Sequence, residues 1–129
     1  MDAPRILIVD DDATHLACAR ELLEAEGYEV EVHLTAFGAT EKLIRSRPDL
    51  VLIDMNMPAL SGEGLVSILR RRVHAAGVRV FLYSSNDEDA LREAARRLDI
   101  DGWISKGDPA ELRRKVGRAL ASSRAGAER

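Results

Sequence analysis

Polar side chains that could do chemistry directly follow short apolar runs at four places in the sequence. They are Asp10, Asp11 and Asp12 after residues 6–9, Asp54 after 50–53, Ser84, Ser85 and Asn86 after 78–83, and Lys106 after 103–104. Neighbouring carboxylates raise one another's pKa unless a cation is present, and carboxylates without histidine or thiolate suit Mg²⁺. With a lysine and a hydroxyl beside it, such a cation could stabilise a phosphoryl group, for which Asp54 is a plausible acceptor.

These residues meet only if the apolar runs are neighbouring strands. The runs are continuous rather than alternating, which is typical of parallel strands with helices on both faces. The segments between them carry apolar residues at helical spacing. We expect strands at 6–9, 30–34, 50–53, 78–83 and 103–104, and helices at 15–26, 36–47, 63–76, 87–98 and 110–122.

Strand and helix alternate, which predicts an α/β fold: a doubly wound, flavodoxin-like sheet of five parallel strands in the order 2-1-3-4-5, with helices on both faces. In that order the first and third strands are neighbours, roughly 4.8 Å apart. Asp10, Asp11 and Asp54 should then lie together at the carboxyl ends of the strands, where ligands bind in such folds.

Local signals place several element ends. Gly27, Gly77 and Gly102 are predicted to form the turns between a helix and the next strand, because glycine accepts the left-handed backbone conformation there. Asp108 is predicted to cap the last helix, with Pro109 as its first residue.

Length and composition exclude other classes of protein. The 129 residues, 46% hydrophobic and 32% charged, predict one globular domain over 1–129, with an ordered core at about 4–121 and a frayed tail at 122–129. A net charge of −3 argues against a general nucleic-acid binder, and no apolar stretch is long enough for a membrane span. The chain starts without a signal peptide and has one cysteine, Cys18, so we expect a cytoplasmic protein with Cys18 buried.

The polar residues also carry a family resemblance. Val9-Asp10-Asp11, then Asp54-Met55-Asn56-Met57-Pro58 with Gly62, then Ser84 and Lys106, resemble the CheY-like receiver domain of bacterial two-component response regulators. The resemblance covers about residues 4–121, and the separations agree as well: 44 positions from Asp10 to Asp54 and 22 from Ser84 to Lys106. The second separation favours Ser84 over Ser85 as the relevant hydroxyl.

The resemblance implies roles for the acidic residues. Asp54 would take phosphate from a phosphohistidine. Asp11 and Asp54 would bind Mg²⁺ through their side chains, Asn56 through its backbone carbonyl, and Asp10 through water.

It also implies roles for the surrounding residues. Ser84 would be the switch hydroxyl that turns toward the new phosphate, and Lys106 would pair with the phosphoryl oxygens. Trp103 occupies the place of an aromatic whose rotamer follows the hydroxyl, and Asn56 and Asn86 occupy positions that tune the lifetime of the acyl phosphate.

The implied function is a phosphorylation-dependent signalling switch that changes the face formed by the fourth helix, fifth strand and fifth helix. Such a domain catalyses its own phosphorylation and slow dephosphorylation but is not a turnover enzyme. The expected partners are a sensor histidine kinase or histidine phosphotransfer protein and a downstream protein, with no nucleic acid and no membrane. Because the sequence ends soon after the fifth helix, no output domain is expected; a homodimer formed on phosphorylation is left open.

Three features keep alternatives open. Gly107 stands where receivers usually have a proline in a cis peptide. A cis bond before a residue other than proline is costly, so we expect a trans loop and a different direction of Lys106. This departure leaves open a receiver fold that is used only for binding, without phosphorylation. Asp10 to Thr14 also matches the Asp-x-Asp-x-Thr motif of haloacid-dehalogenase-like phosphatases, with Asp10 as nucleophile and Asp12 as acid/base. Asp12 alone could simply cap the first helix, and His15 could border the site.

Overall fold

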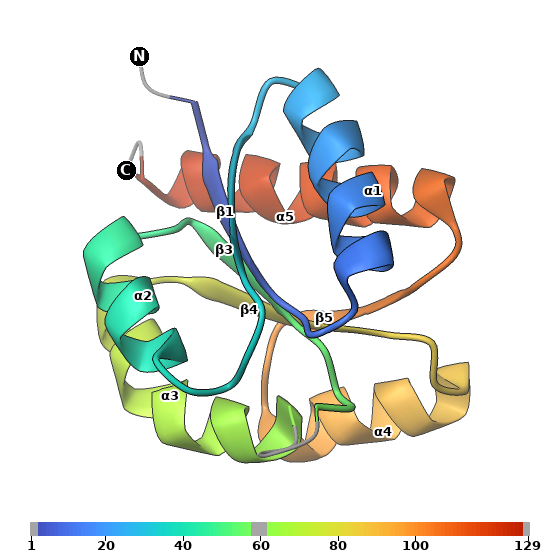
Figure 1. Ribbon diagram of the computed structural model, residues 1–129. Helices are drawn as coiled ribbons and strands as arrows, with labels where there is room; N and C mark the ends of the chain where they lie inside the picture. The colour runs from blue at the N-terminus through green and yellow to red at the C-terminus, as the bar shows by residue number, and fades with distance from the viewer. Residues whose placement is uncertain (1–2, 58–61, 128–129) are drawn as a thin grey trace.

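Figure 1 shows the computed structural model, which describes the backbone of residues 3–57 and 62–127 and the side chains of 3–57 and 64–121. Pro58 of the receiver-like motif lies outside the described residues. The described residues form strands and helices in strict alternation. The strands are β1 (Arg5–Val9), β2 (Glu29–His33), β3 (Leu50–Ile53), β4 (Arg79–Ser84) and β5 (Gly102–Ser105). The helices are α1 (Ala13–Ala25), α2 (Ala39–Ser46), α3 (Gly62–Ala76), α4 (Glu88–Leu98) and α5 (Pro109–Ala127).

All neighbouring strands pair in parallel, and their order is β2-β1-β3-β4-β5. Helices α1 and α5 cover one face of the sheet, and α2, α3 and α4 cover the other (Figure 1). The predicted fold is therefore confirmed, including the adjacency of β1 and β3 on which the acidic site depends.

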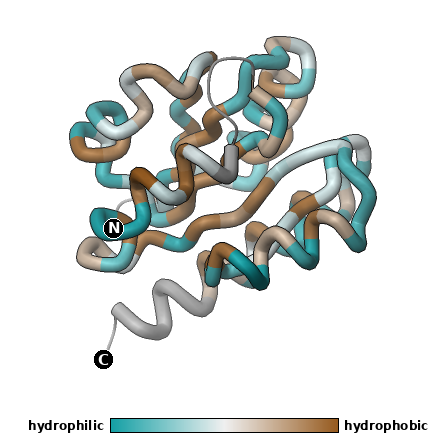
Figure 2. Tube along the Cα trace, turned by 90° about the horizontal axis from the view of Figure 1, so that it is seen from below, coloured by the Kyte–Doolittle hydropathy of each residue, from teal (hydrophilic) through white to brown (hydrophobic). Residues whose placement is uncertain are grey.

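The strands are held between two apolar clusters. Ile6 and Ile8 of β1 pack in the cluster that includes α1 and α5, whereas Leu7 and Val9 pack in the cluster that includes α2, α3 and α4. Figure 2 shows the hydrophobic residues running along the strands between the helices. Burial on both faces explains why these strands read as continuous apolar runs.

Helix ends agree with the local signals in most cases. Gly27 and Gly77 have φ angles of 95° and 70°, as the predicted turns require. Asp108 accepts a hydrogen bond from the Glu111 N–H at 3.1 Å, and α5 begins at Pro109, as predicted. Helix α5 continues to Ala127, beyond the predicted end near residue 122.

Two local predictions are wrong. Gly102 is not a turn residue but the first residue of β5, and the turn before it uses Asp99 with a φ of 54°. A Cβ at Gly102 would lie 2.9 Å from Cε2 of Phe81, so this glycine is required by close packing. Cys18 is exposed, because α1 turns Leu16 and Ala19 toward the sheet and Cys18 away from it.

The Gly102 contact gives a stability prediction. Gly102→Ala should lower the free energy of unfolding by about 1–3 kcal/mol, because the new methyl group overpacks against the Phe81 ring. Gly117→Ala is the matched control: its Cβ would meet only Tyr28 Oη at 3.8 Å, in the interior of α5. That change should stabilise the protein by about 0.5–1 kcal/mol. Urea denaturation measures both, and equal effects of the two substitutions would contradict the packing argument.

Candidate functional site

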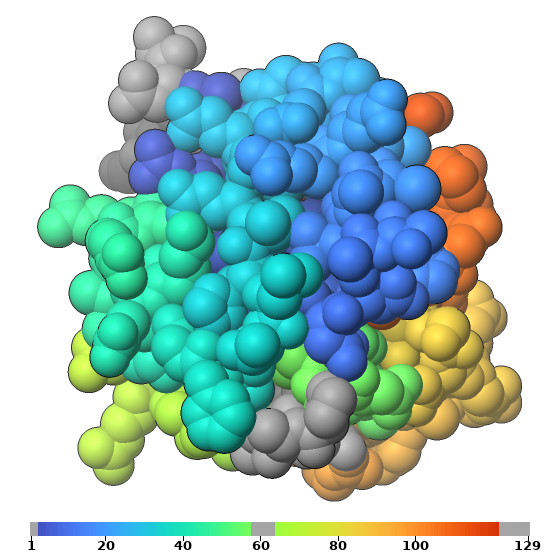
Figure 3. All heavy atoms as spheres, in the orientation of Figure 1, coloured from blue at the N-terminus to red at the C-terminus, as the bar shows by residue number. Residues whose placement is uncertain are grey.

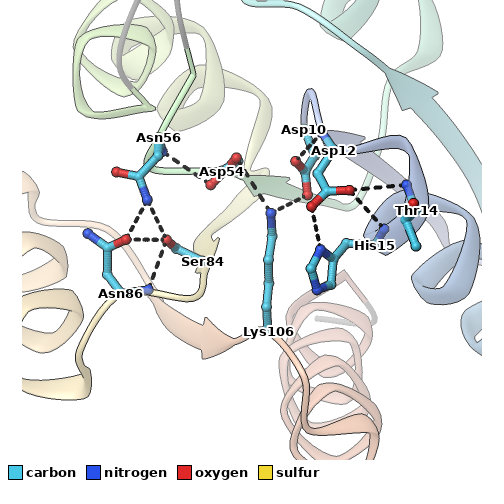
Figure 4. A network of polar contacts seen from close by, with 9 residues as sticks. All are labelled: Asp10, Asp12, Thr14, His15, Asp54, Asn56, Ser84, Asn86 and Lys106. Atoms are coloured by element: carbon cyan, nitrogen blue, oxygen red, sulfur yellow. Dashed lines mark hydrogen bonds and ion pairs between the residues drawn. The ribbon is translucent and has the colours of Figure 1, made fainter.

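The carboxyl ends of β1, β3, β4 and β5 bring the candidate residues to one place (Figure 4). Val9 pairs with Ile53 across β1 and β3, and Asp54 N–H donates to the Val9 carbonyl at 2.9 Å. The residues that follow these two strands therefore emerge side by side. In Figure 3 the blue residues after β1 and the green residues after β3 meet at the surface.

Asp10, Asp11 and Asp54 form a carboxylate cluster whose ligand oxygens all lie within 4.8 Å of one another. Asp10 and Asp54 are buried, with exposed fractions of 0% and 4%, whereas Asp11 is exposed. One carboxylate thus lies at the surface and two lie beneath it. Asp10 Oδ2 is buried, and apart from its ion pair with the Lys106 ammonium group it has no hydrogen-bond partner among the described residues.

Lys106 supplies the positive charge beside this cluster. Its Nζ lies 2.7 Å from Asp10 Oδ2 and 3.5 Å from Asp54 Oδ2, and the lysine side chain is only 5% exposed. The Lys106 N–H donates to the Ser84 carbonyl at 2.9 Å, which continues the ladder between β4 and β5 past their ends. The Nζ thus reaches both acids, and the expectation that Lys106 points differently than in other receivers stays a prediction.

The loop after Lys106 is trans, as expected, and Gly107 adopts a φ of 89°. This left-handed conformation is one that proline cannot adopt and that other residues adopt only with strain. Glycine at this position therefore matches the loop geometry that the chain uses between β5 and α5.

Burial dominates the acidity of the proposed phosphoacceptor. It raises the pKa of Asp54 to about 6; the Asn56 N–H and the Lys106 charge oppose this rise, and Asp10 adds to it. The Asn56 N–H donates to Asp54 Oδ1 at 3.1 Å. One lysine therefore only partly compensates two buried acids, and a further cation would favour the ionised form of Asp54.

A second polar cluster surrounds Ser84, which is fully buried, whereas Ser85 is exposed. The Ser84 hydroxyl donates to Asn86 Oδ1 at 3.0 Å and accepts from Asn56 Nδ2 at 3.2 Å. Asn56 Nδ2 also donates to Asn86 Oδ1. In this state the hydroxyl is bonded to the two asparagines rather than to Asp54.

Asp12 stands apart from the acidic cluster. Its Oδ1 accepts from the backbone N–H groups of Thr14 and His15 at 3.1 and 3.3 Å, which caps α1, and its Oδ2 contacts His15 Nδ1. The hydrogen bond with His15 is the main cause that lowers the pKa of Asp12. A low pKa and a capping role do not suit a general acid, so this geometry speaks against the phosphatase alternative.

Trp103 is partly buried at the edge of the sheet, and its ring lies beside Lys115 and Arg92 rather than among the acids. Two charged groups near it, Glu111 and Lys115, were not among the residues predicted for the site. Glu111 is almost fully buried, and its carboxylate accepts a hydrogen bond from the Ser105 N–H at 2.6 Å. The capping signal at Asp108 explained the start of α5 but could not reveal this contact with β5.

Comparison with known proteins agrees with this fold. The family model of the response regulator receiver domain matches residues 6–117, so the chain belongs to that family. Receiver domains are signalling domains of two-component systems, generally without enzymatic output of their own.

Individual relatives and solved structures are also similar to this chain. The transcriptional regulatory protein PrrA of Mycobacterium leprae is 32% identical over 121 residues, which are 94% of this chain and 50% of PrrA. The sensor histidine kinase TmoS of Ectopseudomonas mendocina is 29% identical over 97% of this chain and 13% of TmoS. A CheY-like receiver domain from Methanospirillum hungatei has a TM-score of 0.86 at 27% identity, covering 97% of this chain and 99% of that one. The chain thus spans about half the length of PrrA.

No helix among the described residues has both the length and the apolar character that a membrane crossing demands.

The raised pKa of Asp54 predicts a pH-dependent stability. The value is about 6 in the folded protein against 3.8 ordinarily, so this group's contribution to stability is lost as the pH rises from 3.8 through 6. In chelator-treated protein above that window, Asp54→Asn should therefore raise the free energy of unfolding by up to about 3 kcal/mol. The gain should shrink as the pH falls toward 3.8.

Denaturant titrations at several pH values check this, with Glu21→Gln as a control that removes an exposed carboxylate. A gain from Asp54→Asn that stays constant across the pH series would contradict the assigned acidity.

Proposed function

We propose that the chain is a phosphorylation-dependent switch in which Asp54 accepts a phosphoryl group. The observation that carries the proposal is the buried Asp54 carboxylate, which shares the Lys106 ammonium group with Asp10. In the transfer, an Asp54 oxygen forms a bond to phosphorus. The bond from phosphorus to the donor's imidazole nitrogen breaks, its electron pair stays on nitrogen, and an acyl phosphate remains on Asp54.

The donor set fits Mg²⁺. Asp11 and Asp54 would hold the ion through their side chains, Asn56 through its backbone carbonyl, and Asp10 through water, consistent with three carboxylates within reach of one ion. Asp10 and Asp54 are both buried and share the one ammonium group of Lys106, which supports a further cation at this site. When bound, the ion would neutralise charge on the carboxylates and on the phosphoryl oxygens.

The remaining side chains would respond to the new charge. Lys106, already 3.5 Å from Asp54, would pair with the phosphoryl group. Ser84 would leave its bonds to Asn56 and Asn86 in order to donate to a phosphoryl oxygen. A change at Ser84 would then shift the population of two states of the face formed by α4, β5 and α5, with Trp103 following the hydroxyl.

The partner class follows from the similarity to response regulators. A sensor histidine kinase or a histidine phosphotransfer protein would donate the phosphoryl group, consistent with the similarity to a segment of TmoS. We take residues 1–129 as a single receiver domain with its ordered core at about 4–121.

The position of the phosphate tests the proposal. The protein is incubated with Mg²⁺ and phosphoramidate, the acyl phosphate is trapped by borohydride reduction, and the reduced residue is located by mass spectrometry. We expect reduction at Asp54, none in Asp54→Asn, and undiminished reduction in Asp12→Asn. Reduction at Asp10 would favour the phosphatase alternative. No reduction at any aspartate would favour the binding module.

Metal binding gives a separate prediction. Mg²⁺ should raise the melting temperature of the protein, since an ion that binds only the folded state stabilises it. Asp11→Asn should lose most of this rise, because Asp11 is the exposed member of the cluster and its replacement leaves the buried charges in place. Asp12→Asn should keep the rise. Equal responses of the two variants in differential scanning fluorimetry would refute the assigned ligand set.

A further inference from the structure

Trp103 is held by cations from both neighbouring helices. It belongs to β5, the edge strand of the sheet, and it packs partly against the apolar cluster that includes α4. Lys115 of α5 places its Nζ 3.4 Å from the centre of the indole ring and donates a hydrogen bond to the Trp103 carbonyl at 2.8 Å. Arg92 of α4 lies further away, with its Cζ 5.5 Å from the ring centre.

Lys115 is in turn held by a buried carboxylate. Glu111 is 7% exposed, and its Oε1 lies 3.6 Å from Lys115 Nζ, one helical turn along α5. Its Oε2 accepts the Ser105 N–H at 2.6 Å. Glu111 thus ties the position of Lys115 to the end of β5.

The end of β5 is adjacent to the phosphoacceptor site. Ser105 pairs with Ser84 across β4 and β5, and the next residue is Lys106. A continuous set of contacts therefore runs from Ser84 through Ser105 and Glu111 to Lys115 and the Trp103 ring. Two side chains of this set, Glu111 and Lys115, have no part in the proposed phosphoryl transfer.

We propose that Lys115, held by Glu111, is a positioning residue that fixes the resting place of the Trp103 indole. The inference rests on the proposed function in one respect: the indole must leave the Lys115 ammonium group before it can follow a movement of Ser84. The pair therefore stabilises the unphosphorylated state. A cation over an indole at a partly exposed site shifts a two-state equilibrium about five-fold, which is enough to change the response of a signalling domain.

Trp103 is the single tryptophan of the chain, so its fluorescence reports on this contact without interference. We compare acrylamide quenching and near-ultraviolet circular dichroism of the phosphate-free unaltered protein with those of four variants. Lys115→Met removes the charge and keeps much of the length. Lys115→Arg keeps a cation over the ring. Glu111→Gln can still accept from the Ser105 N–H but loses the charge that holds Lys115. Arg114→Met removes a neighbouring exposed cation of α5 and serves as the control.

Lys115→Met should increase quenching of Trp103 and change its circular dichroism. Lys115→Arg should restore both signals, Glu111→Gln should shift them part of the way, and Arg114→Met should leave them unchanged. If Lys115→Met does not fold, the proposal is tested by comparing the Trp103 signals of Glu111→Gln with those of Arg114→Met. The proposal would be overturned if the Lys115 and Glu111 variants gave the same signals as the unaltered protein. It would also be overturned if Arg114→Met changed the signals as much as Lys115→Met.

A second measurement separates this inference from the proposed function. With Mg²⁺ and phosphoramidate, the change in Trp103 fluorescence should be smaller in Lys115→Met than in the unaltered protein, because the indole has already left the cation. If Asp54 takes no phosphate, the proposed function fails, and the phosphate-free comparison still decides the role of Lys115. An equal change in both proteins would contradict the idea that Lys115 opposes the switch.

Discussion

The structure depends on a charge imbalance that the fold itself creates. The parallel order of β1 and β3 forces Asp10 and Asp54 into one buried place, where burial, together with the nearby Asp10 carboxylate, raises the pKa of Asp54 and makes its ionised form costly. The Lys106 ammonium group offsets only part of this cost, because its single positive charge is shared between both acids. A site with more buried negative charge than positive charge is suited to a divalent ion, and Asp11 adds a third carboxylate at its open side.

The proposed switch also requires the Ser84 hydroxyl to change its partners. The Ser84 hydroxyl is fully engaged with Asn56 and Asn86, so it is not free to approach Asp54 without giving up those bonds. Beyond Ser84, the backbone ladder passes to β5, whose end is bonded to Glu111. We therefore regard this state as one held by polar contacts around Ser84 and around Trp103, which the pairing of β4 with β5 connects.

Most of the fold and the composition of the acidic site could be predicted from the sequence, because both follow from short-range patterns. Continuous apolar runs predicted the strands, and the polar residues after these runs were the candidates for the functional site. Contacts between elements were harder. Gly102 looked like a turn, but its lack of a side chain is needed for the Phe81 ring across the sheet. Cys18 was expected in the core because cysteine usually is buried, yet the phase of α1 turns it outward.

The polar contacts between α5 and the edge strand β5 had no signal in the sequence. The bond between Glu111 and Ser105, and the stacking of Lys115 on Trp103, depend on how α5 packs along the edge strand. A regular helical pattern specifies which face of α5 is apolar but not which charged residue reaches the neighbouring strand.

The claim that buried negative charge governs this site can be tested on one carboxyl group. Carbon-13 NMR of the Asp54 side chain, followed against pH in the presence of a chelator, should give a titration midpoint near 6. Saturating Mg²⁺ should move that midpoint downward, since a bound cation favours the ionised form. A midpoint at the ordinary aspartate value that does not respond to Mg²⁺ would contradict the account.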